Sequence, residues 1–180
     1  MREFQCNEAR AQVAGPVVET FLAALGPYRS RGERVVARNC GVTTVATSAD
    51  TFYTLQGYLD ALQEFQQQFN QGLLQRIGVL IFDKAAFPPG IDTAEKALAS
   101  IGPAYQLNHR EAHGGIGTYA WQPGERGGVM VCDNPYPCAF DTGILTSVAK
   151  RFAPEAKVTH VAPERCRHTG ADSCTYKVEW

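Results

Sequence analysis

The stretches YPCAFDTGIL (136–145) and CRHTGADSCTYKVEW (166–180) determine the fold that we expect for this chain. Cys166 and Cys174 flank the turn-forming residues Thr-Gly-Ala-Asp, and β-type residues follow, which predicts a hairpin with a thiol near the tip of each arm. Cys138 stands just before an apolar run with helical spacing. A helix start and a hairpin tip that meet in space would bring three thiolates together.

Three thiolates and one nitrogen or oxygen ligand are what a closed tetrahedral zinc site requires. His160 is our preferred fourth ligand, because imidazole is a good zinc donor and His160 lies near the end of the strand that leads to Cys166. Glu164, His168 and Cys132 remain open as alternatives. The same cysteines could also be buried free thiols, or a redox switch if one of them were exposed and had a low pKa.

The spacing of cysteines and glycines in this region resembles that of 4-vinyl reductase-like domains, and the residues that carry the resemblance are Cys138, Gly143, Cys166, Gly170 and Cys174. That bacterial family includes the sensor regions of aromatic-responsive transcription activators, and its α/β fold is related to a subunit of the TRAPP complex. The resemblance implies a structural zinc held by three cysteines and a glutamate, beside a pocket for a small apolar ligand. Pro163 stands where the family has the glutamate.

Composition indicates one globular domain over 1–180, with an N-terminal helix and strands in 1–50 and the zinc-site motif in 136–180. The net charge of -1 gives no basic excess for binding nucleic acid. No apolar run is long enough to span a membrane, and no signal peptide begins the chain, so we expect a cytoplasmic protein. In a reducing cytosol, six cysteines indicate metal binding or free thiols.

Hydrophobic periodicity and turn residues predict the elements of the first half. We expect a helix over 7–25 that Pro16 would delay to about Gly15, an edge strand at 33–37 in a basic stretch, a strand at 42–47 and one long helix over 51–83.

In the second half, Asp92 and Glu95 have the spacing of a capping box, which predicts a short helix that stops at Gly102-Pro103. Asp141 is expected to cap the next helix. Two hairpins are predicted, one from 117–121 with 129–132 and one from 157–161 with 175–179. Together these elements predict an α/β (α+β) fold, an antiparallel sheet of hairpins with helices packed on one face.

From the residues and the resemblance we expect a binding or sensing domain for a small hydrophobic or aromatic molecule, signalling through a homodimer or a partner protein. The expected pocket lies between sheet and helices and is lined by Tyr58, Phe65, Phe69, Tyr119 and Trp121. No nucleophile constellation or cofactor-binding motif stands out, which favours a binding module over an enzyme.

Three alternatives remain open. The first is a tetrapyrrole vinyl reductase or an accessory to one. The second is a haem-binding sensor that uses His109, His113 or a cysteine as axial ligand. The third is an assembly subunit without a ligand. His109 and His113 are four residues apart, but Gly114 and Gly115 follow, so we expect a loop near the pocket mouth.

Overall fold

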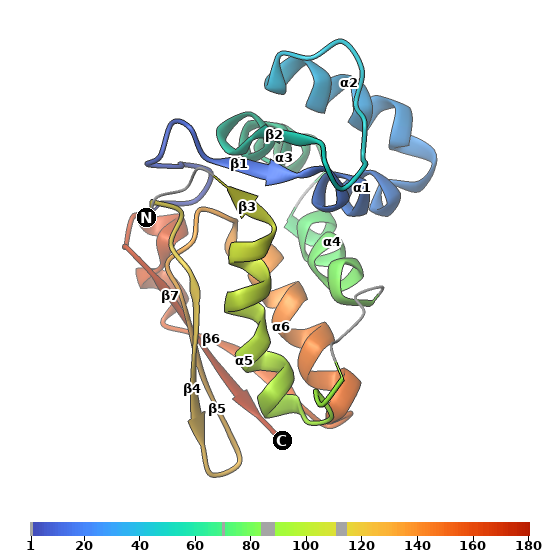
Figure 1. Ribbon diagram of the computed structural model, residues 1–180. Helices are drawn as coiled ribbons and strands as arrows, with labels where there is room; N and C mark the ends of the chain where they lie inside the picture. Colours follow the sequence, from blue (N-terminus) through green and yellow to red (C-terminus); the bar gives the residue numbers. More distant parts are fainter. Residues whose placement is uncertain (1, 70, 84–88, 111–114) are drawn as a thin grey trace.

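A computed structural model describes residues 2–69, 71–83, 89–110 and 115–180 (Figure 1). Its first half contains β1 (Gln12–Ala14), α1 (Gly15–Ala24), α2 (Arg29–Cys40), β2 (Phe52–Thr54), α3 (Leu55–Phe69) and α4 (Gln71–Asp83). Its second half contains α5 (Ala94–Leu107), β3 (His109–Arg110), β4 (Tyr119–Gly124), β5 (Gly127–Cys132), α6 (Cys138–Phe152), β6 (Lys157–Val161) and β7 (Cys174–Glu179). Short 3-10 turns are η1 (Gly26–Tyr28), η2 (Pro163–Arg165) and η3 (Arg167–Thr169).

The strands form two antiparallel sheets, which confirms the expected α+β class. One small sheet has the order β2-β1-β3; it lies below α2, and its strands β1 and β2 contact α3 (Figure 1). The other has the order β4-β5-β7-β6, so both expected hairpins are present and β7 joins them. The register of this sheet places Cys132 opposite Cys174 and His160 opposite Tyr176. Strand β7 lies between β5 and β6, and it therefore brings the candidates Cys132, Cys174 and His160 onto neighbouring strands of one sheet.

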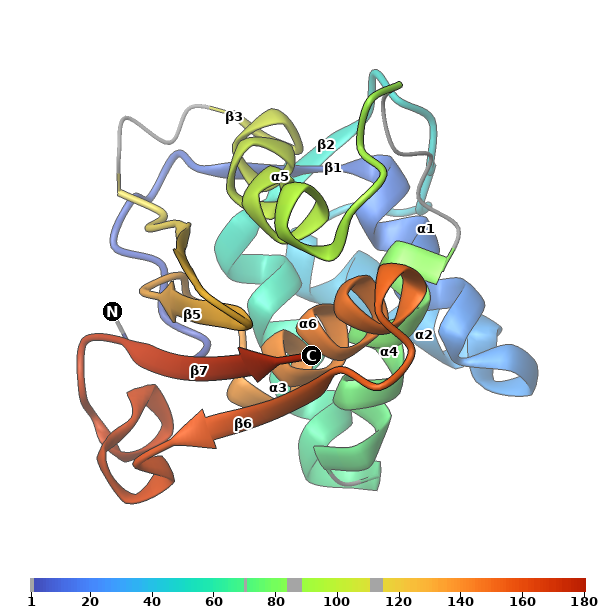
Figure 2. The same ribbon diagram turned by 90° about the horizontal axis from the view of Figure 1, so that it is seen from below.

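Helices cover one face of the four-stranded sheet, where α5 contacts β4 and α6 contacts β6 and β7 (Figure 2). Helix α4 lies directly on α6 because both helices have a glycine at the crossing. A Cβ atom on Gly78 would come within 2.2 Å of the Phe140 carbonyl oxygen, and one on Gly143 within 2.1 Å of the Gln75 carbonyl oxygen. Gly78 and Gly143 therefore allow this close approach.

Three expectations for the first half are wrong. Residues 33–37 belong to helix α2 and not to an edge strand, since the side with Val35 and Val36 is buried while Arg29 and Glu33 pair across one turn. Residues 42–47 form no strand. The expected helix over 51–83 is divided into β2, α3 and α4, because Phe52 and Tyr53 pair with β1 before the helix begins.

Helix boundaries differ from expectation in the second half as well. Helix α5 runs through Pro103 to Leu107 and is capped by Thr93, whose hydroxyl accepts a hydrogen bond from the Lys96 amide at 3.2 Å. Helix α6 begins at Cys138, so Asp141 lies in its first turn and does not cap it. By contrast, α1 begins at Gly15 with Pro16 in its first turn, as expected. None of the described helices is long and apolar enough to cross a membrane.

Candidate functional site

Three cysteines and a histidine converge at one end of the four-stranded sheet. Cys138 opens α6, Cys166 lies between η2 and η3, Cys174 opens β7 and His160 lies on β6. One ligand atom from each of the four lies within 4.8 Å of the other three. The structure thus brings together the four residues that the sequence singled out as metal ligands. We refer to these four residues as the cysteine cluster.

The other candidates for the fourth ligand lie outside this cluster. Cys132 is buried opposite Cys174 in the sheet, but its thiol is not among the converging atoms. The exposed His168 is held by Glu3, whose carboxylate lies 2.9 Å from its Nδ1 atom. Glu164 is exposed in η2. By contrast, the Nε2 atom of His160 is buried and has no hydrogen-bond partner among the described residues.

Within the cluster, the sulfur atoms of Cys138 and Cys174 lie 3.2 Å apart, and those of Cys138 and Cys166 lie 3.8 Å apart. The hydrogen bond from Cys138 and the nearby Arg167 guanidinium lower the pKa of Cys174 to about 4. The hydrogen bond to Cys174, burial and the Glu3 carboxylate raise the pKa of Cys138. The geometry therefore favours a thiolate at Cys174 that accepts a hydrogen bond from the Cys138 thiol.

A buried arginine stands directly behind the cluster. The Nε atom of Arg167 donates to the Cys174 sulfur at 3.3 Å, and the other guanidinium nitrogens bond Asp141 and Asn134. Both members of the Arg167–Asp141 ion pair have no exposed side-chain surface. Burial raises the pKa of Asp141, and the Arg167 cation opposes that shift. The Tyr119 hydroxyl completes the group by donating to Asp141 at 2.6 Å.

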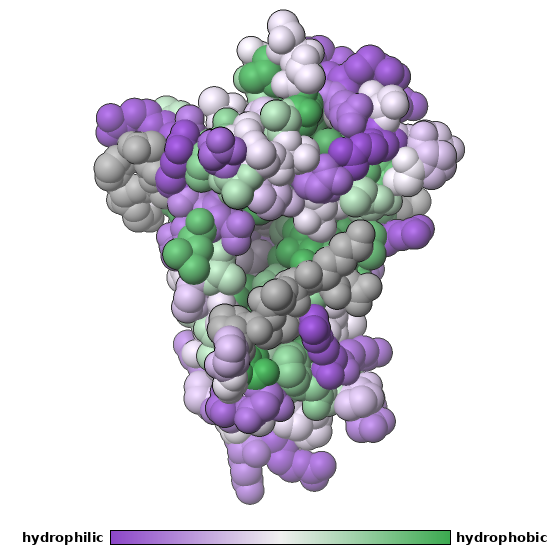
Figure 3. Space-filling view, turned by 45° about the vertical axis from the view of Figure 1, so that its right-hand side comes forward, coloured by the Kyte–Doolittle hydropathy of each residue, from purple (hydrophilic) through white to green (hydrophobic). Residues whose placement is uncertain are grey.

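A second site lies in the middle of the molecule, where α1, α4, α5 and α6 surround a cavity of about 70 Å³. Figure 3 shows hydrophobic residues gathered in a hollow at this level, below the N-terminal helices. The aliphatic part of the lining includes Val17, Ile81, Ile101 and Ile144. The polar part consists of His109, Asn108 and the three tyrosines Tyr105, Tyr119 and Tyr136. We refer to this space as the His109 cavity.

Hydrogen bonds fix the tautomer of His109. Its Nδ1 atom lies 2.7 Å from the Tyr105 carbonyl oxygen, which can only accept, so Nδ1 carries the proton. Its Nε2 atom therefore accepts from the Tyr136 hydroxyl at 2.9 Å. Burial lowers the pKa of His109 to about 4, which keeps the ring neutral at neutral pH. The cavity thus contains a neutral imidazole whose lone pair is occupied by a tyrosine.

Of the five residues expected to line a pocket, Tyr119 lines the His109 cavity. Tyr58 and Phe65 are buried in the core around Phe21. Phe69 stacks on Phe65, and Trp121 stacks on Trp180 at the other end of the sheet. The structure therefore does not bring these five side chains together. His113, the other proposed haem ligand, lies outside the described residues.

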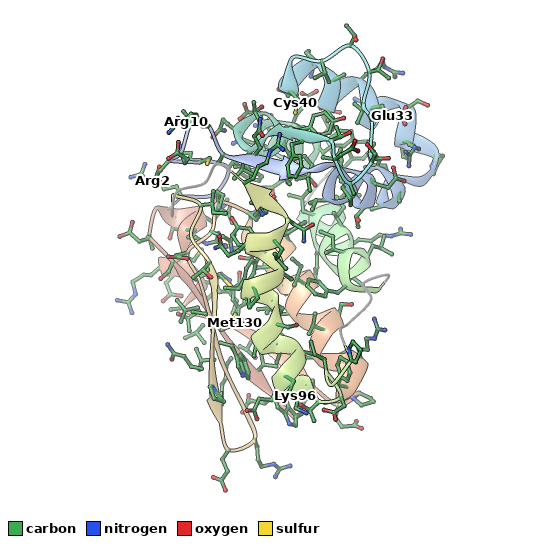
Figure 4. The ribbon with its side chains drawn as sticks, viewed as in Figure 1. Arg2, Arg10, Glu33, Cys40, Lys96 and Met130 are labelled. Carbon is green, nitrogen blue, oxygen red and sulfur yellow. The ribbon has the colours of Figure 1, made fainter. Side chains whose placement is uncertain are left out.

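Sequence reasoning missed Arg167, Asn134, Tyr105 and Tyr136, all of which are at one of the two sites. The one available signal was the arginine directly after Cys166, in a turn where a solvated charge is the usual expectation. Among the remaining thiols, Cys40 lies at the end of α2 with the N-terminal helices (Figure 4). Met130, which lies on β5, is buried.

Neither a protein-family model nor a curated protein sequence matches this chain. Solved structures of H-NOX proteins do match it. An H-NOX protein from S. oneidensis in the Fe(II)NO ligation state is 16% identical with a TM-score of 0.66, over 92% of this chain and 98% of that one. An unliganded Fe(II) H-NOX protein from K. algicida is 14% identical with a TM-score of 0.58, over 92% of this chain and 95% of that one.

These matches correct two expectations. The fold is not that of 4-vinyl reductase-like domains or of the TRAPP subunit, because the matching structures are H-NOX proteins. Zinc as the main cofactor is also wrong, since these neighbours are described by their haem and its iron. These matches do not alter the convergence of the side chains of Cys138, Cys166, Cys174 and His160 in the structure. The chain has the fold of H-NOX proteins.

Proposed function

We propose that this chain is a sensory domain that binds a small, largely apolar molecule in the His109 cavity. The observation that carries the proposal is a largely apolar cavity whose lining includes the neutral imidazole of His109, hydrogen-bonded to the Tyr136 hydroxyl. The H-NOX fold of the chain supports the same function, because neighbours with this fold are described with NO or CO bound at ferrous iron. A haem-binding sensor is the alternative that these neighbours favour.

The donor chemistry of the cavity is partly suited to haem. His109 has its proton on Nδ1 and a lone pair on Nε2, which is the arrangement of an imidazole that ligates a metal. The volume does not fit, because a cavity of about 70 Å³ is well below the roughly 300 Å³ or more of ordinary ligand pockets. Haem would therefore require the His109–Tyr136 bond to open and the lining to move apart.

Reconstitution with haem tests this proposal. We expect weak haem uptake by the wild type, seen as a low Soret absorbance, and higher uptake by Tyr136→Phe, because that change frees Nε2 of His109. His109→Phe should abolish the band in both backgrounds.

A colourless protein that is stabilised by small apolar molecules, with the effect lost in the cavity-filling variant Ala104→Leu, would support a sensor without haem. Equal behaviour of the wild type and Ala104→Leu toward both haem and small molecules would refute the cavity as the ligand site.

We infer further that the domain works in the cytoplasm and passes its signal to a second copy or a partner protein. All six cysteines are free thiols in the structure, as is usual in a reducing compartment. The exposed edge of β6 and its side chain Val161, 43% exposed, offer one surface for such a contact.

We also propose that the cysteine cluster holds a soft divalent metal ion in a closed, structural site. Three sulfur atoms and one imidazole nitrogen already converge within 4.8 Å, and the unpartnered Nε2 of His160 supplies a buried lone pair. Four protein ligands leave no position for a substrate, so this site would stabilise the fold and not perform catalysis.

Cobalt(II) is a suitable probe for the cluster, because thiolate ligation gives it strong absorption bands. We expect one cobalt ion per chain, with bands that are lost in Cys166→Ser and kept in Cys40→Ser, whose thiol lies outside the cluster. Bands that persist in Cys166→Ser, or that are lost equally in Cys40→Ser, would refute the assignment. Elemental analysis of the protein as purified then identifies the metal that occupies the site in the cell.

A further inference from the structure

A chain of buried polar contacts runs from the cysteine cluster to the His109 cavity. It begins at the Cys174 sulfur, which accepts from Arg167 Nε at 3.3 Å. Arg167 then pairs with Asp141, and Asp141 accepts from the Tyr119 hydroxyl at 2.6 Å. The Tyr119 ring is part of the cavity lining, and it contacts Tyr105 edge to face. Each step is a direct contact between side chains.

Every link of this chain is shielded from water. Arg167 is 1% exposed, Cys174 is 1% exposed and Asp141 is fully buried. A buried polar atom that loses its partner costs roughly 1–3 kcal/mol and cannot turn to solvent instead. A change in charge or position at Cys174 must therefore be taken up by Arg167 and then by Asp141. The Tyr119 hydroxyl must then adjust to any movement of Asp141. Burial and the Asp141 carboxyl raise the pKa of Tyr119, so its hydroxyl keeps its proton and remains the donor.

We propose that the cysteine cluster and the His109 cavity are energetically coupled through Cys174, Arg167, Asp141 and Tyr119. The state of the cluster then sets the affinity of the cavity for its ligand, and ligand binding alters the metal affinity of the cluster by the same factor. This inference rests on the proposed function of the two sites. It assigns to Arg167 and Asp141 the role of positioning residues that touch neither ligand.

Two cysteines of the cluster provide a matched comparison. Cys138→Ser and Cys174→Ser each remove one sulfur from the same site, but only Cys174 accepts a hydrogen bond from Arg167. The readouts are the ring nitrogen NMR signals of His109, which need no ligand, and the affinity of the cavity for xenon, an apolar probe that enters small dry cavities. We expect Cys174→Ser to shift the His109 signals and to change xenon affinity about fivefold. Cys138→Ser should change both by a smaller factor, because it leaves the hydrogen bond from Arg167 to Cys174 in place.

The reverse direction is tested with two tyrosines of the cavity. Tyr119→Phe removes the hydroxyl that binds Asp141, whereas Tyr105→Phe removes one that binds the Ile116 carbonyl oxygen at 2.9 Å. Only Tyr119→Phe should change the cobalt(II) affinity of the cluster, again about fivefold. In the Tyr119→Phe background, the difference between the two serine variants should vanish.

The proposal is overturned if the two serine variants move the His109 signals equally or not at all. It is also overturned if Tyr105→Phe and Tyr119→Phe change cobalt affinity alike. Failure of the proposed function looks different, because xenon would then not bind the wild type while the His109 signals would still separate Cys174→Ser from Cys138→Ser. Circular dichroism of each variant confirms that the fold is retained, and Tyr119→Phe, which leaves the cluster intact, decides the question if Cys174→Ser does not fold.

Discussion

The cysteine cluster and the His109 cavity differ in how their polar atoms are satisfied. In the cluster, donors converge on one point and the Nε2 atom of His160 has no partner among the described residues. In the cavity, both nitrogens of His109 are hydrogen-bonded and little space is left. A site of the first kind already presents several donor atoms to one ion. A site of the second kind must break an internal bond before it binds anything larger than a few atoms.

The strongest test of this comparison breaks the buried ion pair between Arg167 and Asp141, which lies between the two regions. Asp141→Asn leaves the buried Arg167 without its carboxylate partner, and we expect a loss of about 3–5 kcal/mol in the free energy of unfolding. Chemical denaturation measures this loss. Asp92→Asn is the control, because Asp92 pairs with Lys96 on the surface, where salt bridges contribute little. Equal effects of the two changes would contradict the view that the buried pair holds the regions together.

We expect acid to lower the stability of the folded protein, because it favours protonation of His109. Its pKa is about 4 in the folded protein and about 6.5 when unfolded, so the unfolded state binds more protons between these values. The contribution of neutral His109 to the free energy of unfolding is then fully present above about pH 6.5. It is lost as the pH drops toward 4, by at most about 3 kcal/mol.

Thermal and denaturant unfolding between pH 7 and pH 4 measure this slope. His109→Gln should flatten this dependence of stability on pH, because it removes the group whose pKa differs between the folded and unfolded states. A slope that is unaffected by His109→Gln would show that His109 is not buried as a neutral ring.

The smallest expected effect concerns the hydrogen bond between Tyr136 and His109 in the cavity lining. Tyr136→Phe removes the hydroxyl that donates to His109 Nε2, and we expect stability to fall by about 1 kcal/mol. Tyr105→Phe breaks a comparable bond to the Ile116 carbonyl oxygen and gives the reference value. Only Tyr136→Phe should raise the affinity of His109 for a metal that imidazole binds, such as copper(II). Equal copper affinity in both variants would contradict the idea that Tyr136 blocks this nitrogen.

Short-range patterns predicted a good part of the fold. The hairpins were correct because alternating β-type residues around turn residues specify local pairing, and α1 began at Gly15 because Pro16 suits a first helical turn. The errors arose where distant contacts decide. Residues 52–54 form a strand only because β1, far back in the chain, lies beside them. Arg29–Cys40 is helical because one of its faces is covered by other elements.

By itself, the sequence determined the class of the fold and pointed to the three cysteines of the cluster, with His160 as the preferred fourth residue among several, because the residue type and spacing of cysteine and histidine indicate metal-binding chemistry. Only the tertiary structure decided the H-NOX fold, the His109 cavity and the buried chain from Cys174 to Tyr119. Tyrosine, aspartate and arginine occur throughout the surfaces of proteins. Their role here follows from burial and from partners up to 33 residues away, which no local pattern encodes.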